Sequence, residues 1–152
     1  MESLINGMLV SSDAVLAPGA AALRTWMIIS AVMYAVGGAS FLLGQNLLLE
    51  NTNRISALLF RDRFPLMPLS TEKFWLTLTG SMMLMLVALC VYAAVDPARY
   101  SAMVVVVLLS KAFSTSQYLF YFVKEKRYFG YIVGVLTDGP LFLVTLYFFV
   151  RA

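Results

Sequence analysis

Two charged residues, Lys111 and Asp138, stand inside apolar stretches on either side of the polar run at 124–127. Lys111 lies 13 residues before that run, and Asp138 lies 11 residues after it. If one helix enters this turn and another leaves it, both side chains reach a similar depth, close to the centre of a bilayer. A lone charge at that depth costs about 2.5–3.5 kcal/mol. We therefore expect the two residues to face each other.

Three roles fit such a pair. It could relay protons, it could bind a polar headgroup, or it could be a structural ion pair that joins two helices, because polar contacts commonly hold helices together in membranes. Pro140 favours the first two roles. It cannot donate a hydrogen bond to the carbonyl of Leu136, so we expect the helix to kink beside Asp138. Broken helices at mid-membrane often line binding sites.

The residues around the pair extend the candidate site. A polar stripe at helical spacing should face the interior of the bundle, and its members are Ser110, Lys111, Ser114, Gln117, Tyr118 and Tyr121. Gly130 and Gly134 precede Asp138 at four-residue spacing, which lets a neighbouring helix approach closely. We take Lys111, Asp138, Ser114, Gln117 and Tyr118 as the candidate binding or proton-relay residues.

A second polar group, Gln45, Asn46 and Glu50, ends the first apolar stretch. These residues could coordinate a headgroup or a cation, or they could only mark the membrane interface. Upstream, Ser30, Gly37 and Gly44 stand at heptad spacing, with Gly38 beside them, which predicts a helix-packing seam.

The inventory of the 152 residues excludes several classes of function. There is no histidine, which removes zinc sites of the usual kind, haem bound through histidine and Ser-His-Asp chemistry. The single cysteine, Cys90, cannot form an internal disulfide. Hydrophobic residues make up 61% and charged residues 12%, which excludes a disordered chain and a basic nucleic-acid-binding domain. We expect no metal, no nucleic acid and no cofactor beyond a bound lipid or quinone.

Four long stretches with almost no charge predict the architecture, at about 25–49, 72–95, 97–123 and 128–150. At about 1.5 Å per residue, each is long enough to cross about 30 Å of hydrocarbon as a helix. We therefore expect an all-α, polytopic membrane protein with one domain, a bundle of four transmembrane helices. Asp96-Pro97 should cap and begin the third helix, and Ser70 or Thr71 should cap the second.

Two further segments predict short interfacial helices. Residues 1–23 carry apolar residues at helical spacing, and Pro18-Gly19 should end that helix. In the long loop at 51–70, Ile55, Leu58 and Leu59 share one helical face, which predicts an amphipathic helix on the membrane surface. Pro65 and Pro68 should stop it. The alternative is an irregular connection whose arginines contact lipid phosphates.

Basic residues predict the orientation. The first and third loops carry seven bases, and the opposite side carries three, with Lys111 left out as intramembrane. The positive-inside rule then places both loops in the cytoplasm and both termini outside. We expect a multi-pass protein of a bacterial-type inner membrane.

The stretch 74–150 resembles the DoxX-like small four-helix bacterial membrane proteins. The resemblance lies in the apolar second stretch, the turn Val95-Asp96-Pro97-Ala98-Arg99, the lysine that follows Val107-Leu108-Leu109-Ser110, and the step Thr137-Asp138-Gly139. It implies a four-helix membrane fold. Some members of that group are associated with quinone-linked sulfur oxidation or with redox partner proteins.

Three functions fit these observations. The first is an accessory or lipid- and quinone-facing module with an interior Lys-Asp polar site, whose partners are the bilayer and possible further membrane subunits or a second copy. The alternative is a small proton-coupled transporter that uses Lys111 and Asp138. The third is a quinone-linked enzyme subunit, so enzymatic activity stays open.

Overall fold

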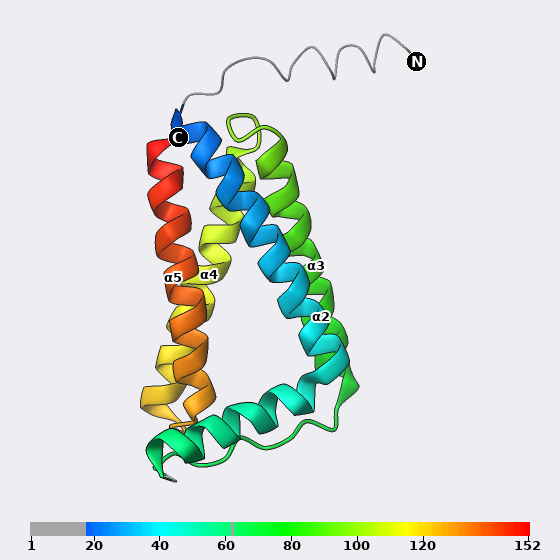
Figure 1. The fold of residues 1–152 in the computed structure, drawn as a ribbon, viewed down its shortest axis with the longest axis vertical. Helices are drawn as coiled ribbons and strands as arrows, with labels where there is room; N and C mark the ends of the chain where they lie inside the picture. Colours follow the sequence, from blue (N-terminus) through cyan, green and yellow to red (C-terminus); the bar gives the residue numbers. More distant parts are fainter. Residues whose placement is uncertain (1–17, 62) are drawn as a thin grey trace.

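The computed structural model describes residues 18–61 and 63–152, and this part of the chain is helical without strands. Its helices are α2 (Pro18–Phe60), α3 (Lys73–Val95), α4 (Ser101–Lys124) and α5 (Phe129–Arg151) (Figure 1). All four are long and apolar enough to cross a membrane. The predicted all-α class is therefore confirmed. The expected helix before Pro18 lies outside the described residues, and Pro18 itself begins α2 instead of ending a helix.

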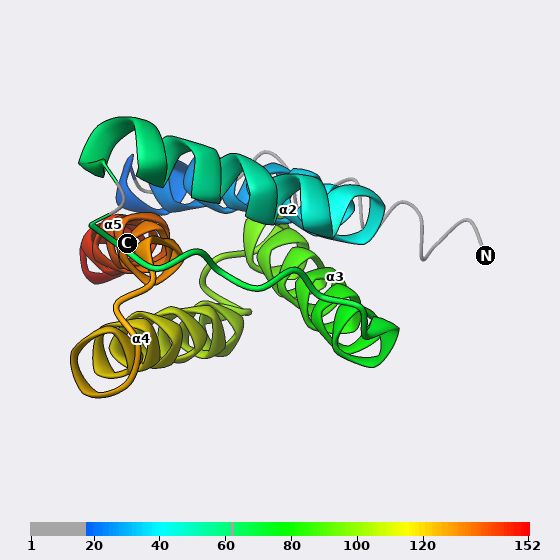
Figure 2. The same cartoon turned by 90° about the horizontal axis from the view of Figure 1, so that it is seen from below.

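Helix α2 is longer than predicted and changes direction at Gly44, whose φ of −146° and ψ of 38° are not helical. Residues 18–43 run along the bundle, and residues 45–60 lie across its base (Figures 1 and 2). We call this second segment the base helix. It is the amphipathic helix expected in the first loop, but it starts immediately after Gly44. It ends at Phe60, before Pro65, where Arg61 adopts a left-handed φ of 48°.

Two predicted helix starts are wrong by a few residues. Asp96 does not cap α4 directly, because its carboxylate accepts a hydrogen bond from the Arg99 N–H at 3.0 Å and closes a turn, and α4 begins at Ser101. The N-cap of α3 is Glu72 rather than Ser70 or Thr71, and it makes no side-chain capping bond.

The helices pack as two antiparallel pairs, α2 with α3 and α4 with α5 (Figure 1). Glycines allow close approach in the first pair. A Cβ on Gly38 would lie 2.9 Å from Cβ of Met83, and one on Gly80 would lie 2.8 Å from Cδ2 of Leu42. Of the expected seam, Gly38 lies at this contact, whereas Gly37 has no neighbour within 4 Å of such a Cβ and Gly44 meets only Leu47 of its own helix. The helix rotates by about 100° between adjacent residues, which places Gly38 instead on the contact face.

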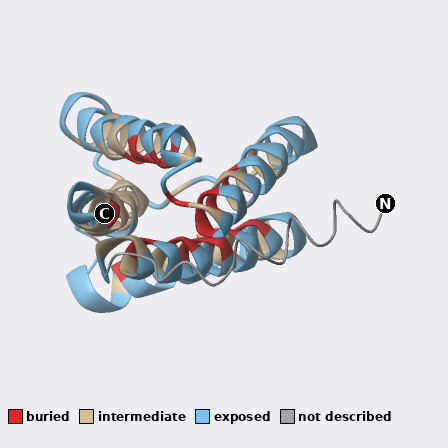
Figure 3. Ribbon diagram, turned by 90° about the horizontal axis from the view of Figure 1, so that it is seen from above, coloured by how far each residue is buried: buried red, intermediate tan, exposed pale blue. Residues whose placement is uncertain are grey.

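Burial divides the bundle into two parts. The segments 18–38, 86–111 and 139–151, which lie toward the C-terminus, together form what we call the terminal half. The segments 39–60, 63–85 and 112–138 form what we call the loop half. The terminal half holds the core of buried apolar residues: Leu23, Met27, Ala31, Tyr34, Leu86, Cys90, Ala93, Ala94, Val104, Val107 and Leu108. Seen from above, the buried segments lie where the helices approach one another (Figure 3). In the described loop half, only Ser56 is buried.

A buried hydrogen bond joins the two helix pairs in the terminal half. The indole N–H of Trp26 on α2 donates to the hydroxyl of Thr145 on α5 at 2.8 Å, and Thr145 donates to the carbonyl of Leu141 at 2.6 Å. Thr145 is 2% exposed. Because both groups are satisfied out of water, this contact fixes the approach of α2 to α5.

Candidate functional site

Lys111 on α4 and Asp138 on α5 form an ion pair, with Nζ of the lysine 3.0 Å from Oδ1 of the aspartate. Only 6% of the lysine side chain and 14% of the aspartate side chain is exposed. The four-residue turn at 125–128 forces α4 and α5 to run side by side, which brings both residues to the same depth. The predicted contact between them is therefore confirmed.

Ser114 completes the carboxylate's contacts. Its hydroxyl donates a short hydrogen bond to Oδ2 of Asp138, so each carboxylate oxygen accepts one bond from α4. Ser114 lies one turn after Lys111, at the spacing at which helix residues share a face. The carboxylate is thus held in one orientation, and its charge is balanced without a residue from α2 or α3.

The other side of Lys111 faces α2. Its Nζ lies 4.7 Å from the centre of the Tyr34 ring on α2, a cation–π distance. Helices α2, α4 and α5 therefore contribute to the surroundings of the ammonium group.

Within the described residues, three buried hydroxyl groups have no hydrogen-bond partner: those of Ser30, Tyr34 and Thr115. Lys111 also uses only one of its three N–H donors on Asp138. A buried donor without a partner destabilises a fold by about 1–3 kcal/mol. The site therefore holds unused hydrogen-bonding capacity beside the ion pair.

The rest of the predicted polar stripe has a different role. Tyr118 lies against Gly134, where any Cβ would overlap the ring, so this glycine permits the close contact of α4 and α5. Tyr131 stacks near Tyr118, with ring centres 6.3 Å apart. Gln117 is half-buried and makes no side-chain hydrogen bond within the described residues. Helix α5 continues through Pro140 without a non-helical residue like Gly44 in α2, and the expected kink beside Asp138 stays a prediction.

The structure uses Asn46 differently from the prediction. Its side chain accepts a hydrogen bond from the Ser70 N–H at 3.0 Å and donates to the Ser70 carbonyl at 3.1 Å. Asn53, which sequence analysis missed, makes the same two contacts with Met67, at 2.8 and 2.9 Å. These two asparagines hold the extended segment 63–72, which we call the strap, beside the base helix (Figure 2). Asn46 and Asn53 are seven residues apart and so lie on one helix face, and this spacing is the sequence pattern that could have identified them as a pair.

The strap also contacts α5. A Cβ on Gly130 would overlap the sulfur of Met67, so this glycine admits a strap side chain rather than a neighbouring helix. Phe64 of the strap lies 6.0 Å from Phe129 and 6.2 Å from Phe122, between ring centres. The strap therefore links the base helix to the start of α5.

Gln45 does not join the ion pair. It lines a shallow cavity of about 350 Å³ at the bend of α2, with Asn46, Ser70 and Lys73 among its neighbours. Glu50 is exposed and makes no hydrogen bond within the described chain. Residues 18–61 and 63–152 contain no group of three acidic or cysteine side chains able to hold a metal ion.

Comparisons with protein-family models, with curated proteins and with solved structures find no match to this chain. The protein can therefore be classified only by its geometry. It is a bundle of four apolar helices with one buried ion pair between α4 and α5.

Proposed function

We propose that this chain is a multi-pass inner-membrane protein that acts as an accessory, lipid-facing module and holds a neutral lipid or quinone in its loop half. The burial pattern carries this proposal. Apolar and aromatic side chains line the loop half, yet only Ser56 is buried there within the described residues. Side chains packed to the usual density of a protein interior would be buried. An apolar molecule between the helix pairs would supply the missing contacts.

The polar site lies at the inner limit of this region. The α2–α3 pair and the α4–α5 pair diverge toward the base (Figure 1), and Lys111 and Asp138 lie at the border between the terminal half and the loop half as defined above. A charged headgroup is costly at mid-membrane, whereas a carbonyl or hydroxyl group reaches that depth more easily. Lys111 retains two N–H donors for such an acceptor. A neutral lipid with one polar end is therefore the ligand class that fits both the depth and the donors.

A proton-coupled transporter fits these observations less well. Transport of a proton or ion through the pair requires water to reach it. Two cavities among the described residues lie at the bend of α2 and at the start of α2, and neither of these two is lined by Lys111 or Asp138.

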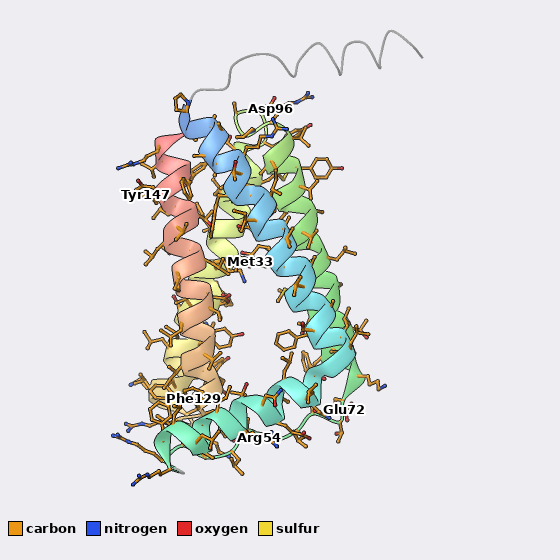
Figure 4. The ribbon with its side chains drawn as sticks, viewed as in Figure 1. Met33, Arg54, Glu72, Asp96, Phe129 and Tyr147 are labelled. Carbon is orange, nitrogen blue, oxygen red and sulfur yellow. The ribbon has the colours of Figure 1, made fainter. Side chains whose placement is uncertain are left out.

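The proposed orientation rests on charge. Arg54 and Glu72 lie at the base, whereas Asp96 and Tyr147 lie at the opposite end (Figure 4). Both basic loops meet at the base, so the positive-inside rule assigns the base to the cytoplasm. Thr71→Cys and Ala98→Cys, each in a Cys90→Ala background, test this in intact cells. An impermeant thiol reagent should label position 98 and not position 71, and the reverse pattern would invert the topology.

Lipid extraction tests the ligand. The protein purified in mild detergent should retain a neutral lipid or quinone at about one molecule per chain. The double variant Lys111→Met/Asp138→Asn should fold and lose that molecule, while it keeps ordinary phospholipid. Equal retention of the neutral lipid by parent and variant would contradict a role for the pair. Pair-dependent proton uptake by vesicles, without bound lipid, would support the transporter instead.

A further inference from the structure

The base helix presents an apolar face that no described part of the chain covers. Leu47, Ile55, Leu58 and Leu59 are 62%, 47%, 75% and 66% exposed, whereas Ser56 on the opposite side is 4% exposed. The base helix lies across the ends of the other helices rather than parallel to them (Figures 1 and 2). This is the arrangement of a helix in the plane of a membrane surface, with its apolar side toward the acyl chains.

Seven basic side chains surround the same end of the molecule: Arg54, Arg61, Arg63, Lys73, Lys124, Lys126 and Arg127. None of them pairs with a described acidic residue, because Lys111–Asp138 is the only ion pair in the described chain. Arg54 projects from the base helix next to the exposed apolar face, since it lies seven residues after Leu47 and four before Leu58. The charge and the apolar face therefore belong to one surface.

From these two observations we propose that the base is a docking surface for anionic phospholipids. The apolar side chains enter the acyl region, and the arginines bind phosphates of the same leaflet. This goes beyond the proposed function, because it concerns a different surface and does not depend on the Lys111–Asp138 site. Charge complementarity selects the occupant. The segments 50–73 and 124–127 also carry Glu50, Asp62, Glu72 and Glu125, so seven bases against four acids leave a net charge of +3 at this end. A leaflet of zwitterionic lipid offers apolar contact but no net attraction for that charge.

A tryptophan probe on the base helix measures this preference. The chain has two tryptophans, so Leu58→Trp is made with Trp26→Phe and Trp75→Phe. The protein is reconstituted into phosphatidylcholine vesicles, and brominated phosphatidylglycerol or brominated phosphatidylcholine is titrated in as quencher. Brominated phosphatidylglycerol should quench the probe more strongly, and the preference should fall in 0.5 M salt because salt screens exposed charges.

The chain offers a matched control. Arg54→Gln/Arg61→Gln/Arg63→Gln removes three bases from the base, and Arg24→Gln/Arg99→Gln/Arg151→Gln removes the three from the opposite end. One base near an anionic surface strengthens association about five-fold. The first triple variant should therefore lower the preference for phosphatidylglycerol by at least about five-fold, while the second should leave it unchanged.

Three results would overturn the proposal. The parent could show no preference for the anionic quencher, the two triple variants could lower the preference equally, or aqueous iodide could quench the probe while both lipids do not. The last result would indicate that the apolar face is exposed to water and binds a protein partner instead of lipid. If the first triple variant does not fold, the salt dependence of the parent still decides the question.

Discussion

The terminal half and the loop half belong to the same helices, yet they pack differently. Where helices meet in the terminal half, small residues such as Ala31, Cys90 and Ala93 are fully or almost fully buried. Small side chains let helices approach closely, and close approach is what drives helix association in membranes. The corresponding faces of the loop half carry Tyr118, Tyr131 and other large rings, which remain partly exposed.

The base helix maintains this difference. Its 16 residues span about 24 Å at the usual helical rise, and it runs from the α3 side to the α5 side of the base (Figure 1). The two helix pairs therefore meet at one end and stay apart at the other. The comparison shows that sequence apolarity alone does not create a core, because the close contacts of the loop half at Gly80 and Gly134 lie within a helix pair and not between the pairs.

The ion pair lies where the two halves meet, and breaking it should have the largest effect. Lys111→Met and Asp138→Asn each leave one buried charge without its partner, which typically destabilises by about 3–5 kcal/mol. The double variant removes both charges and should recover much of the loss. Thermal unfolding in detergent measures all three proteins. Single variants as stable as the parent would show that the contact does not support the fold.

A matched pair of methionines tests the packing contrast directly. Met27 in the terminal half is 0% exposed, and Met82 in the loop half is 50% exposed. Met27→Ala should leave a cavity and destabilise by about 2–3 kcal/mol. Met82→Ala should change stability by less than about 0.5 kcal/mol. Chemical unfolding in mixed micelles measures both, and equal losses would mean that the loop half is as well packed as the terminal half.

Alanine substitution at two glycines should change the free energy of unfolding in opposite directions. Gly134→Ala places a methyl group into the ring of Tyr118 and should destabilise by about 1–3 kcal/mol. Gly37→Ala meets nothing within 4 Å and should stabilise by about 0.5–1 kcal/mol, because alanine favours the helix. Unfolding midpoints measured side by side check the prediction. A destabilised Gly37→Ala variant would indicate that this face of α2 contacts a partner.

The smallest effect on global stability is expected for a change that loosens the strap. Asn53→Ala removes two hydrogen bonds to Met67, which together contribute about 1–3 kcal/mol to holding the strap. Hydrogen exchange of residues 63–72 should accelerate while the global unfolding temperature changes little. Asn51→Ala is the control, because Asn51 is exposed and makes no side-chain hydrogen bond within the described residues. Unchanged exchange in Asn53→Ala would show that the hydrogen bonds of Asn53 do not hold the strap.

Features set by short-range rules were predictable from the sequence. The four helices follow from runs without charge, and the Lys111–Asp138 contact follows from a tight turn and the high cost of a lone charge at that depth. The bend at Gly44 was not predictable in this way, because glycine inside an apolar helix is usually tolerated. Asn46 and Asn53 bind the backbone of a segment 14 to 24 residues away, and no local pattern specifies such a partner.

Gly37 and Gly38 illustrate a related limit. Both residues are small and lie in the same apolar run, and only the rotation of α2 against α3 decides which one faces Met83. That rotation depends on every contact along the two helices. The pattern of small residues therefore identified the helix that packs closely, but not which of its two adjacent glycines lies at the contact.

The short turn at 125–128 also governs how the chain could enter a membrane during synthesis. Helix α4 alone would carry an unpaired ammonium group into hydrocarbon, and α5 alone would carry an unpaired carboxylate. An α4–α5 hairpin instead presents a neutral pair to the lipid. We therefore expect α4 to wait beside the insertion machinery until Asp138 has emerged from the ribosome, whereas α3, which has no charge from 74 to 95, can partition by itself.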